Sequence, residues 1–166
     1  MRKISFNIFV FFSIVLFCSL GTWQIYRLQW KIDLISEIKN GLELEPIFYS
    51  KKNIKNYQKV KFSGVFDFDK QVYLYSLNSS GAPGYDIITP VKTKSNEVLL
   101  VNRGWIQRDL KSIEDINLID TNNFEGIIKK ISKPNIFKPE NDIKNNIWYS
   151  LKIDDLENFT GYQLSN

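Results

Sequence analysis

The amino-acid sequence predicts an N-terminal transmembrane α-helix followed by a mostly-β domain of the α+β class, folded as a small barrel-like or curled antiparallel sheet. The first observation behind this prediction is an uncharged apolar stretch over residues 4–20. The second is a change after Pro46 from helical spacing to alternation of apolar and polar residues. We therefore expect an anchor over residues 1–25, an amphipathic stalk and connection over 26–45, and a β-rich extracytoplasmic domain over 46–166.

The apolar stretch is long enough to cross a membrane. Extended to Ile25 it reaches about 33 Å at 1.5 Å per residue, which matches the hydrocarbon core of a bilayer. Trp23, Tyr26 and Trp30 form an aromatic belt at its exit, with Arg27 and Lys31 near the lipid phosphates. A cleavable signal peptide is the alternative interpretation, because a weak cleavage site occurs at residues 19–21. With a retained anchor, the large domain is expected on the outer face of the membrane.

A helical apolar stripe continues beyond the expected membrane exit. Its members are Ile25, Leu28, Ile32, Ile35 and Ile38. Gly41 is expected to end this helix. The stripe predicts a stalk that packs on the domain, and a contact with a partner helix is the alternative.

Short runs bounded by turn residues predict five or six strands in the domain. The runs cover Tyr57–Phe66, Gln71–Leu77, Ile87–Lys92, Glu97–Ile106, Phe124–Ile131 and Ile147–Ile153. The third and fourth runs are expected to form a hairpin around residues 94–96, with Pro90 limiting the third to an edge or a bulge. Residues 78–84 are expected to form a loop, and an acidic stretch over 112–120 a connection. A short helix is expected from Asp154, which would serve as its cap.

The composition excludes several classes of function. The chain has no histidine, so a histidine-ligated zinc site, a Ser-His-Asp triad and an imidazole-ligated haem are excluded within it. Its one cysteine, Cys18, lies in the apolar stretch. Residues 1–39 hold five bases and two acids, which leaves only one of the four net positive charges for the rest of the chain. Nucleic acid is therefore not an expected partner.

Three stretches of the sequence together resemble one protein family. The helix exit carries Gly21, Trp23, Gln24 and Arg27, and the centre of the domain carries Gly84, Tyr85, Pro90, Asn102, Arg103, Gly104 and Trp105. The third stretch runs from Phe137 to Asp142 and continues to Trp148, Tyr149 and Asp154. Their order and spacing resemble the surfeit locus protein 1 family, the Shy-type cytochrome c oxidase assembly factors.

This resemblance implies a protein of the bacterial plasma (inner) membrane or of the mitochondrial inner membrane, with its domain on the periplasmic or intermembrane-space face. It implies a non-enzymatic role in the maturation of the catalytic subunit of cytochrome c oxidase, at the stage of haem a insertion. The implied partners are the membrane, that catalytic subunit and haem a synthase.

The sequence departs from the family pattern at its C-terminal end. Members of the family usually continue into a second transmembrane helix, preceded by a histidine proposed as a haem ligand, whereas this sequence stops at Asn166. We therefore expect a domain that is incomplete at its C-terminus, and no haem bound by this chain alone. The alternatives are an extracytoplasmic ligand- or protein-binding β-barrel unrelated to oxidase, and a truncated non-functional remnant.

The motif residues have a structural and a functional interpretation, and the structural one is favoured. Gly104 would lie at a bulge, Trp105 would fill the core, and Arg103 would satisfy nearby carbonyl or carboxylate groups. Alternatively, Arg103 would bind a partner or a haem propionate through its planar fork. Gln24 would contact a neighbouring helix. No catalytic or metal-binding residue is predicted, because the paired aspartates at 67/69 and 154/155 lie where turns and caps use Asp.

Overall fold

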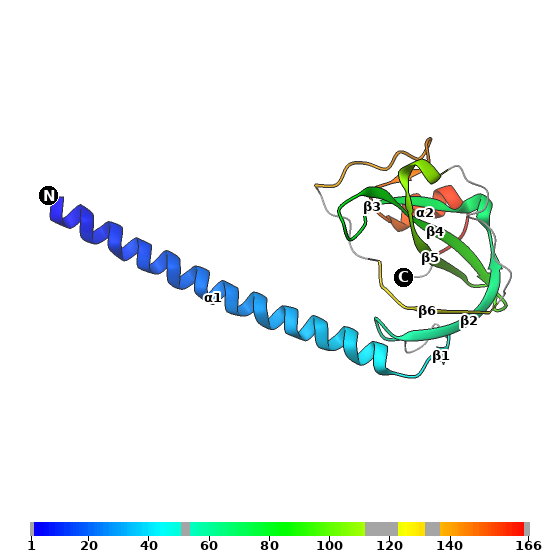
Figure 1. The fold of residues 1–166 in the computed structure, drawn as a ribbon, viewed down its shortest axis with the longest axis horizontal. Helices are drawn as coiled ribbons and strands as arrows, with labels where there is room; N and C mark the ends of the chain where they lie inside the picture. The colour runs from blue at the N-terminus through cyan, green and yellow to red at the C-terminus, as the bar shows by residue number, and fades with distance from the viewer. Residues whose placement is uncertain (1, 51–53, 112–122, 132–136, 165–166) are drawn as a thin grey trace.

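A computed structural model describes residues 2–50, 54–111, 123–131 and 137–164. It contains one long helix with a sheet domain at its C-terminal end, as Figure 1 shows. The elements are α1 (Arg2–Glu43), β1 (Ile47–Phe48), β2 (Lys59–Phe66), the short 3-10 helix η1 (Phe68–Lys70), β3 (Val72–Leu77), β4 (Pro83–Thr93), β5 (Val98–Gln107), η2 (Arg108–Leu110), β6 (Asn123–Ile127), β7 (Ile147–Trp148) and α2 (Ile153–Thr160). The predicted acidic connection over 112–120 lies outside the described residues.

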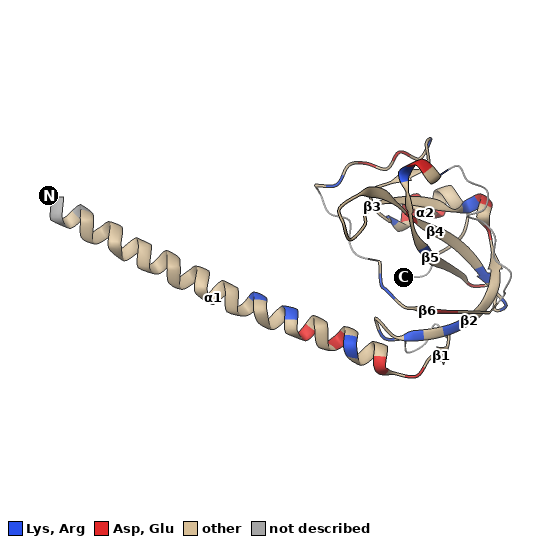
Figure 2. Ribbon diagram, viewed as in Figure 1, with Lys and Arg blue, Asp and Glu red and all other residues tan. Residues whose placement is uncertain are grey.

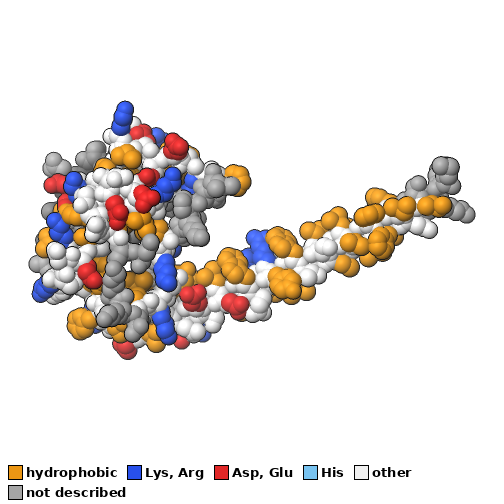
Figure 3. All heavy atoms as spheres, turned by 180° about the vertical axis from the view of Figure 1, so that it is seen from behind, with side chains coloured by type: hydrophobic (Ala, Val, Ile, Leu, Met, Phe, Trp, Pro, Cys, Tyr) orange, Lys and Arg blue, Asp and Glu red, His pale blue; other side chains and the backbone are white. Residues whose placement is uncertain are grey.

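Helix α1 is continuous over 42 residues, and its apolar side chains are exposed along almost its whole length. In the described chain it is the one helix that is long and apolar enough to cross a membrane. In Figure 2 the ribbon of α1 carries no charged colour between its grey N-terminal tip and its middle, and Figure 3 shows apolar side chains along the same half. The hydroxyl groups of Ser13, Ser19 and Thr22 each donate to the carbonyl group four residues earlier, at 2.8–2.9 Å. These bonds satisfy the hydroxyl donors without water, as an apolar surrounding requires.

The prediction that the apolar stripe of the stalk packs on the domain is wrong for four of its five residues. Ile25, Leu28, Ile32 and Ile35 are between 50% and 69% exposed. Between residues 26 and 43 only Leu34, Ile38 and Gly41 are shielded, and they share one face near the end of the helix.

The domain meets this face because Gly41 permits a close approach. A Cβ atom at Gly41 would lie 2.6 Å from the carbonyl oxygen of Tyr57. The prediction that Gly41 ends the helix is wrong, because α1 continues to Glu43. Its role in the structure is to let the chain at Tyr57 contact the stalk.

The described strands form one open mixed sheet, so the predicted α+β class with a helical anchor is confirmed. Strand β4 is its centre, with β5 along one side and β3 followed by β2 along the other. The hairpin of β4 and β5 around residues 94–96 is confirmed. Two pairings, β1 with β2 and β3 with β7, are parallel, so the sheet is not purely antiparallel as expected.

Strand β2 joins two parts of this curled sheet. Its first half pairs with β1 and β6, and its second half pairs with β4. Gly64 lies where the partner changes, and a Cβ atom there would lie 2.5 Å from the carbonyl oxygen of Lys92 and from a methyl group of Val91. A glycine lets the two backbones approach at this bend.

Pro90 lies in the central strand of the sheet, so its prediction as an edge or bulge residue is wrong. The ladder between β4 and β3 ends at Ile88, and the ladder between β4 and β2 begins at Val91. Pro90 fills the gap between these ladders, where its carbonyl group accepts from the backbone N–H of Asp67 at 2.9 Å. A missing N–H group is tolerated because neither β3 nor β2 pairs with Pro90 on this side, while Leu100 of β5 lies opposite it on the other side.

The sheet has two buried faces. One face packs against α2 through Val72, Ile88, Trp148 and Leu156, which are at most 4% exposed. We call it the apolar face. The opposite face carries Tyr73, Tyr85 and Ile87. We call it the tyrosine face.

The C-terminal elements differ from their predicted boundaries. Strand β7 contains two residues, because Asn141 accepts the backbone N–H groups of Tyr149 and Ser150 through its side-chain oxygen. Helix α2 has Lys152 at its N-cap, with no side-chain capping bond. Asp154 lies instead in the first turn, where its charge favours the helix dipole. Strand β6 ends at Ile127, and residues 128–130 bond to the turn at 56–58.

Candidate functional site

A β-bulge opposite Ile87 contains the central residues of the motif. Asp86 pairs with Trp105 and Ile88 pairs with Asn102, so Arg103 and Gly104 together oppose one residue of β4. Gly104 has a φ angle of 120°, which favours glycine. The side-chain oxygen of Asn102 accepts from its N–H at 2.9 Å. The extra residue reverses the alternation of side chains along β5.

Alternation from Val101, which pairs with Thr89, places Arg103 on the tyrosine face, and the bulge moves only the residues after it to the other face. Its guanidinium carbon lies 5.7 Å from the ring centroid of Phe66 and 5.0 Å from that of Phe68, and the two rings are stacked. Its Nη1 donates to the side-chain oxygen of Gln71 at 3.3 Å. Burial lowers the pKa of Arg103 below its usual value, with a smaller opposing effect of Tyr73. The result is a half-buried cation held by aromatic rings and an amide.

Gln71 connects Arg103 to a buried polar network. Its oxygen also accepts from the hydroxyl of Thr89 at 3.3 Å, and its side-chain nitrogen donates to the hydroxyl of Tyr73 at 2.8 Å. Gln71, Thr89 and Tyr73 are 6%, 0% and 8% exposed. The ammonium group of Lys111 lies 4.9 Å from the ring centroid of Tyr73 and 5.6 Å from that of Tyr85. We call Arg103, Gln71, Thr89, Tyr73 and the two phenylalanines the Arg103 cluster.

Trp105 follows the bulge on β5 and therefore lies on the apolar face, as does Gly84 of β4. A Cβ atom at Gly84 would lie 2.3 Å from the indole ring of Trp105, so the tryptophan lies directly on the glycine backbone. Its Nε1 donates to the carbonyl of Ser76 at 3.4 Å. Trp105 is half-buried and covers the edge of the sheet, so its expected place in the core is wrong.

The structure therefore brings some of the predicted motif residues together and separates others. Arg103 and Tyr85 share the tyrosine face, whereas Gly84 and Trp105 share the opposite one. Sequence reasoning did not find Phe66, Phe68 and Gln71, which complete the Arg103 cluster. Gln71 carried one usable signal, since a polar residue at the start of an apolar strand run requires a partner.

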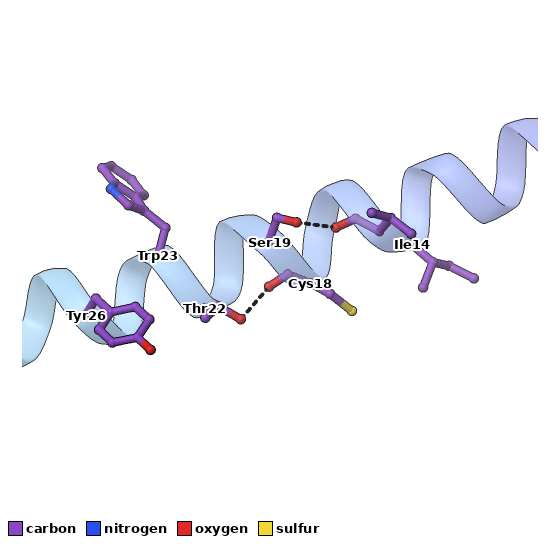
Figure 4. Close-up of a pocket in the computed structure, with 7 residues that line it drawn as sticks. Ile14, Cys18, Ser19, Thr22, Trp23 and Tyr26 are labelled. Carbon is purple, nitrogen blue, oxygen red and sulfur yellow. Dashed lines mark hydrogen bonds between the residues drawn. The ribbon is translucent and has the colours of Figure 1, made fainter.

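The motif residues of α1 form a separate site. The guanidinium carbon of Arg27 lies 5.4 Å from the ring centroid of Trp23, one turn away, which is typical of a membrane interface. Figure 4 shows the neighbouring side of α1, where small side chains leave a shallow hollow. Its lining residues are Ile14, Val15, Cys18, Ser19, Thr22, Trp23 and Tyr26. A Cβ atom at Gly21 would meet nothing within 4 Å.

The chemistry of the Arg103 cluster suits binding better than catalysis. Its polar groups are a guanidinium, an amide and two hydroxyls, and none of these is a general base near neutral pH. Among the described residues, no group of three His, Cys, Asp or Glu side chains could hold a metal ion. The chain has no histidine, and its one cysteine and one methionine lie at positions 18 and 1. The domain therefore lacks the His, Cys and Met ligands that hold haem iron in most haem proteins.

Comparison with known proteins decides the family. The model of the SURF1 family matches residues 11–165. The chain belongs to the SURF1 family. A SURF1-like protein of Rickettsia conorii is 34% identical over 168 residues, which cover 99% of this chain and 69% of the relative.

More distant members of the SURF1 family match the same chain. A SURF1-like protein of Dictyostelium discoideum is 30% identical, over 92% of this chain and 71% of the relative. Surfeit locus protein 1 of Gallus gallus is 30% identical, over 87% of this chain and 54% of the relative. The family predicted from the three motif stretches is thus confirmed.

Proposed function

We propose that this chain is a membrane-anchored, non-enzymatic assembly factor for cytochrome c oxidase, acting in haem a insertion into the catalytic subunit or in its maturation. Membership of the SURF1 family over residues 11–165 is the observation that carries this proposal. Helix α1 supports it, because a factor for a membrane-embedded enzyme needs a place in the same membrane. We propose the bacterial plasma membrane or the mitochondrial inner membrane, with the domain on the outer face.

In this proposal the domain acts by contact with partners, which are the oxidase catalytic subunit and haem a synthase. The Arg103 cluster offers a positioned cation next to aromatic rings, which suits recognition of a carboxylate. Gln71 and the two phenylalanines fix the guanidinium before a partner arrives, and so reduce the entropy lost on binding. No bound haem is assigned to this chain, because its domain lacks the usual iron ligands.

The proposal is tested by deleting the gene in an organism with no second copy. The absorbance of haem a and the amount of assembled oxidase in membranes are expected to fall, while haem b of other complexes stays constant. The full chain supplied from a plasmid is expected to restore both. Unchanged oxidase after the deletion would contradict the proposal.

A matched pair of variants then separates the Arg103 cluster from the fold. Arg103→Gln is expected to restore less oxidase than the natural chain at equal amounts of protein in the membrane. Lys94→Gln removes one positive charge from an exposed turn of the hairpin and serves as the control. Equal restoration by both variants would leave the Arg103 cluster without a role in assembly.

A further inference from the structure

One side of the domain combines exposed apolar and basic residues in two chain segments. Residues 128–131 carry Lys129, Lys130 and Ile131, and residues 137–138 are Phe137 and Lys138. The three lysines are exposed, Ile131 is 41% exposed and Phe137 is 88% exposed. A phenylalanine on the surface of a soluble domain is seldom so fully exposed, since burial of its apolar ring is favourable.

The first segment is held in a fixed position relative to α1. The N–H of Tyr57 donates to the carbonyl of Ile128 at 2.7 Å, and the N–H of Ile128 donates to the carbonyl of Gln58 at 3.0 Å. The N–H of Lys130 donates to the side chain of Asn56 at 3.1 Å. Because the backbone of Tyr57 also contacts α1 at Gly41, the stalk and the segment 128–131 share one joint.

The second segment lies closer to the anchor along the long axis of the molecule. Figure 1 shows that the segment following the grey stretch 132–136 begins at the end of the domain nearest to the N-terminal half of α1 along the long axis of the molecule. In Figure 2 the ribbon is coloured for Lys or Arg close to this point and in the segment after β6. Gly41 follows Arg27 by 14 residues, or about 21 Å of helix. The segments 128–131 and 137–138 therefore lie on the side of the domain that faces the expected membrane exit.

The residue types on this side match a lipid head-group surface. The two segments hold three lysines and no acid, and the nearest acid after them in sequence is Glu140. Arg27 and Lys31 add positive charge to the stalk at the membrane exit. Lysines near an anionic bilayer are attracted to its phosphate groups, and an aromatic ring is favoured at the head-group level.

We propose that the domain rests on the surface of the bilayer that holds α1, through the segments 128–131 and 137–138. Phe137 and Ile131 enter the interface, while Lys129, Lys130 and Lys138 bind anionic phosphate groups of lipids. Because the joint at Gly41 lies about 21 Å of helix beyond Arg27, α1 must tilt from the bilayer normal for both segments to reach the head groups. The domain then has one fixed orientation on the membrane. This inference concerns the membrane alone and does not depend on the proposed role in oxidase assembly.

The test uses the full chain in nanodiscs of phosphatidylcholine with phosphatidylglycerol. Cys18→Ser removes the native thiol, and Phe137→Cys provides a site for a nitroxide label. Val65→Cys is the matched control, because Val65 is an apolar residue with 66% exposure on β2. The collision rates of each label with oxygen and with a water-soluble nickel complex report its depth. The label at 137 is expected to be shielded from nickel and accessible to oxygen, and the label at 65 to behave as in water.

Equal exposure of both labels to nickel would overturn the proposal. So would a label at 137 that becomes shielded only after the oxidase catalytic subunit is added, because the surface would then bind protein.

A second variant tests the lysines. Lys129→Gln with Lys130→Gln is expected to lift the label at 137 out of the interface, whereas Lys94→Gln with Lys152→Gln, of equal charge, leaves it there. An unchanged depth in the first pair would overturn the assignment of lipid phosphate to the lysines.

Discussion

The two faces of the central sheet are built by different means. The apolar face is closed by Trp148 and Leu156, which come from the C-terminal part of the chain and are fully buried. The tyrosine face contains hydrogen-bonded groups, with Gln71 accepting from both Thr89 and Arg103. The apolar face thus depends on burial of area, whereas the tyrosine face depends on partners at fixed distances. A substitution on the first should lower stability most, and one on the second should change specific contacts.

The largest effect is expected for Trp148→Ala. The side chain is 0% exposed and packs against Phe159 with ring centroids 5.5 Å apart. Its removal is expected to lower the free energy of unfolding by about 3–5 kcal/mol. Denaturant unfolding of the full chain in detergent, followed by circular dichroism, measures this. Trp148→Phe keeps most of the packing and should lose clearly less; equal losses would show that this face is not held by burial.

A smaller loss of stability is expected for a substitution of Gly84, which lies under Trp105 on the apolar face. Gly84→Ala would place a Cβ atom 2.2 Å from the carbonyl oxygen of Ile106, so the backbone of β5 must shift. We expect a loss of about 1–3 kcal/mol in the free energy of unfolding, together with a changed fluorescence of Trp105. Gly21→Ala is the control, since its added methyl group meets nothing within 4 Å. A Gly84→Ala chain as stable as the control would contradict the close contact.

Substitution of Arg103 tests the tyrosine face directly. Arg103→Gln removes the cation from Phe66 and Phe68 and its hydrogen bond to Gln71. We expect a loss of about 1–2 kcal/mol in the free energy of unfolding. Arg103→Lys keeps the charge and is expected to lose less. A loss as large as that of Trp148→Ala would show that both faces are held in the same way.

The sequence was sufficient for the anchor and for most of the central strands. Apolar alternation predicted β2, β3 and the hairpin of β4 and β5, because side chains of a strand alternate between two faces. It did not predict the site of Pro90, since the gap between two ladders depends on where β2 and β3 end. It also placed the stalk contact on the wrong stripe, because that contact depends on the backbone of Tyr57 rather than on apolar spacing.

The candidate site was predicted only in part, for a related reason. The bulge glycine, Gly104, could be predicted from its position within a strand. The partners of Arg103 come from the end of β2, from η1 and from the start of β3, and no local pattern connects these positions. Their meeting follows from the register of β2, β3 and β5 against β4.

The smallest effect concerns pH at the edge of the sheet beside β7. Hydrogen bonds from Asn145 lower the pKa of Asp142 below its usual value. A carboxyl group with a lower pKa in the folded chain stabilises it above the unfolded value of 3.8, and this stabilisation is lost as the pH falls through the folded pKa. Thermal unfolding from pH 5 to pH 2 should show this loss in the natural chain and a weaker one in Asp142→Asn. Parallel curves for the two chains would contradict the assignment.

The proposed function and the proposed contact of the domain with the bilayer surface both require that α1 stays in the membrane as part of the mature chain. Washing isolated membranes with sodium carbonate at high pH, followed by mass spectrometry of the pellet, measures this directly. We predict that the intact chain, including the residues before Gly21, remains in the pellet. Release into the supernatant, or a mature chain that starts after residue 20, would contradict it.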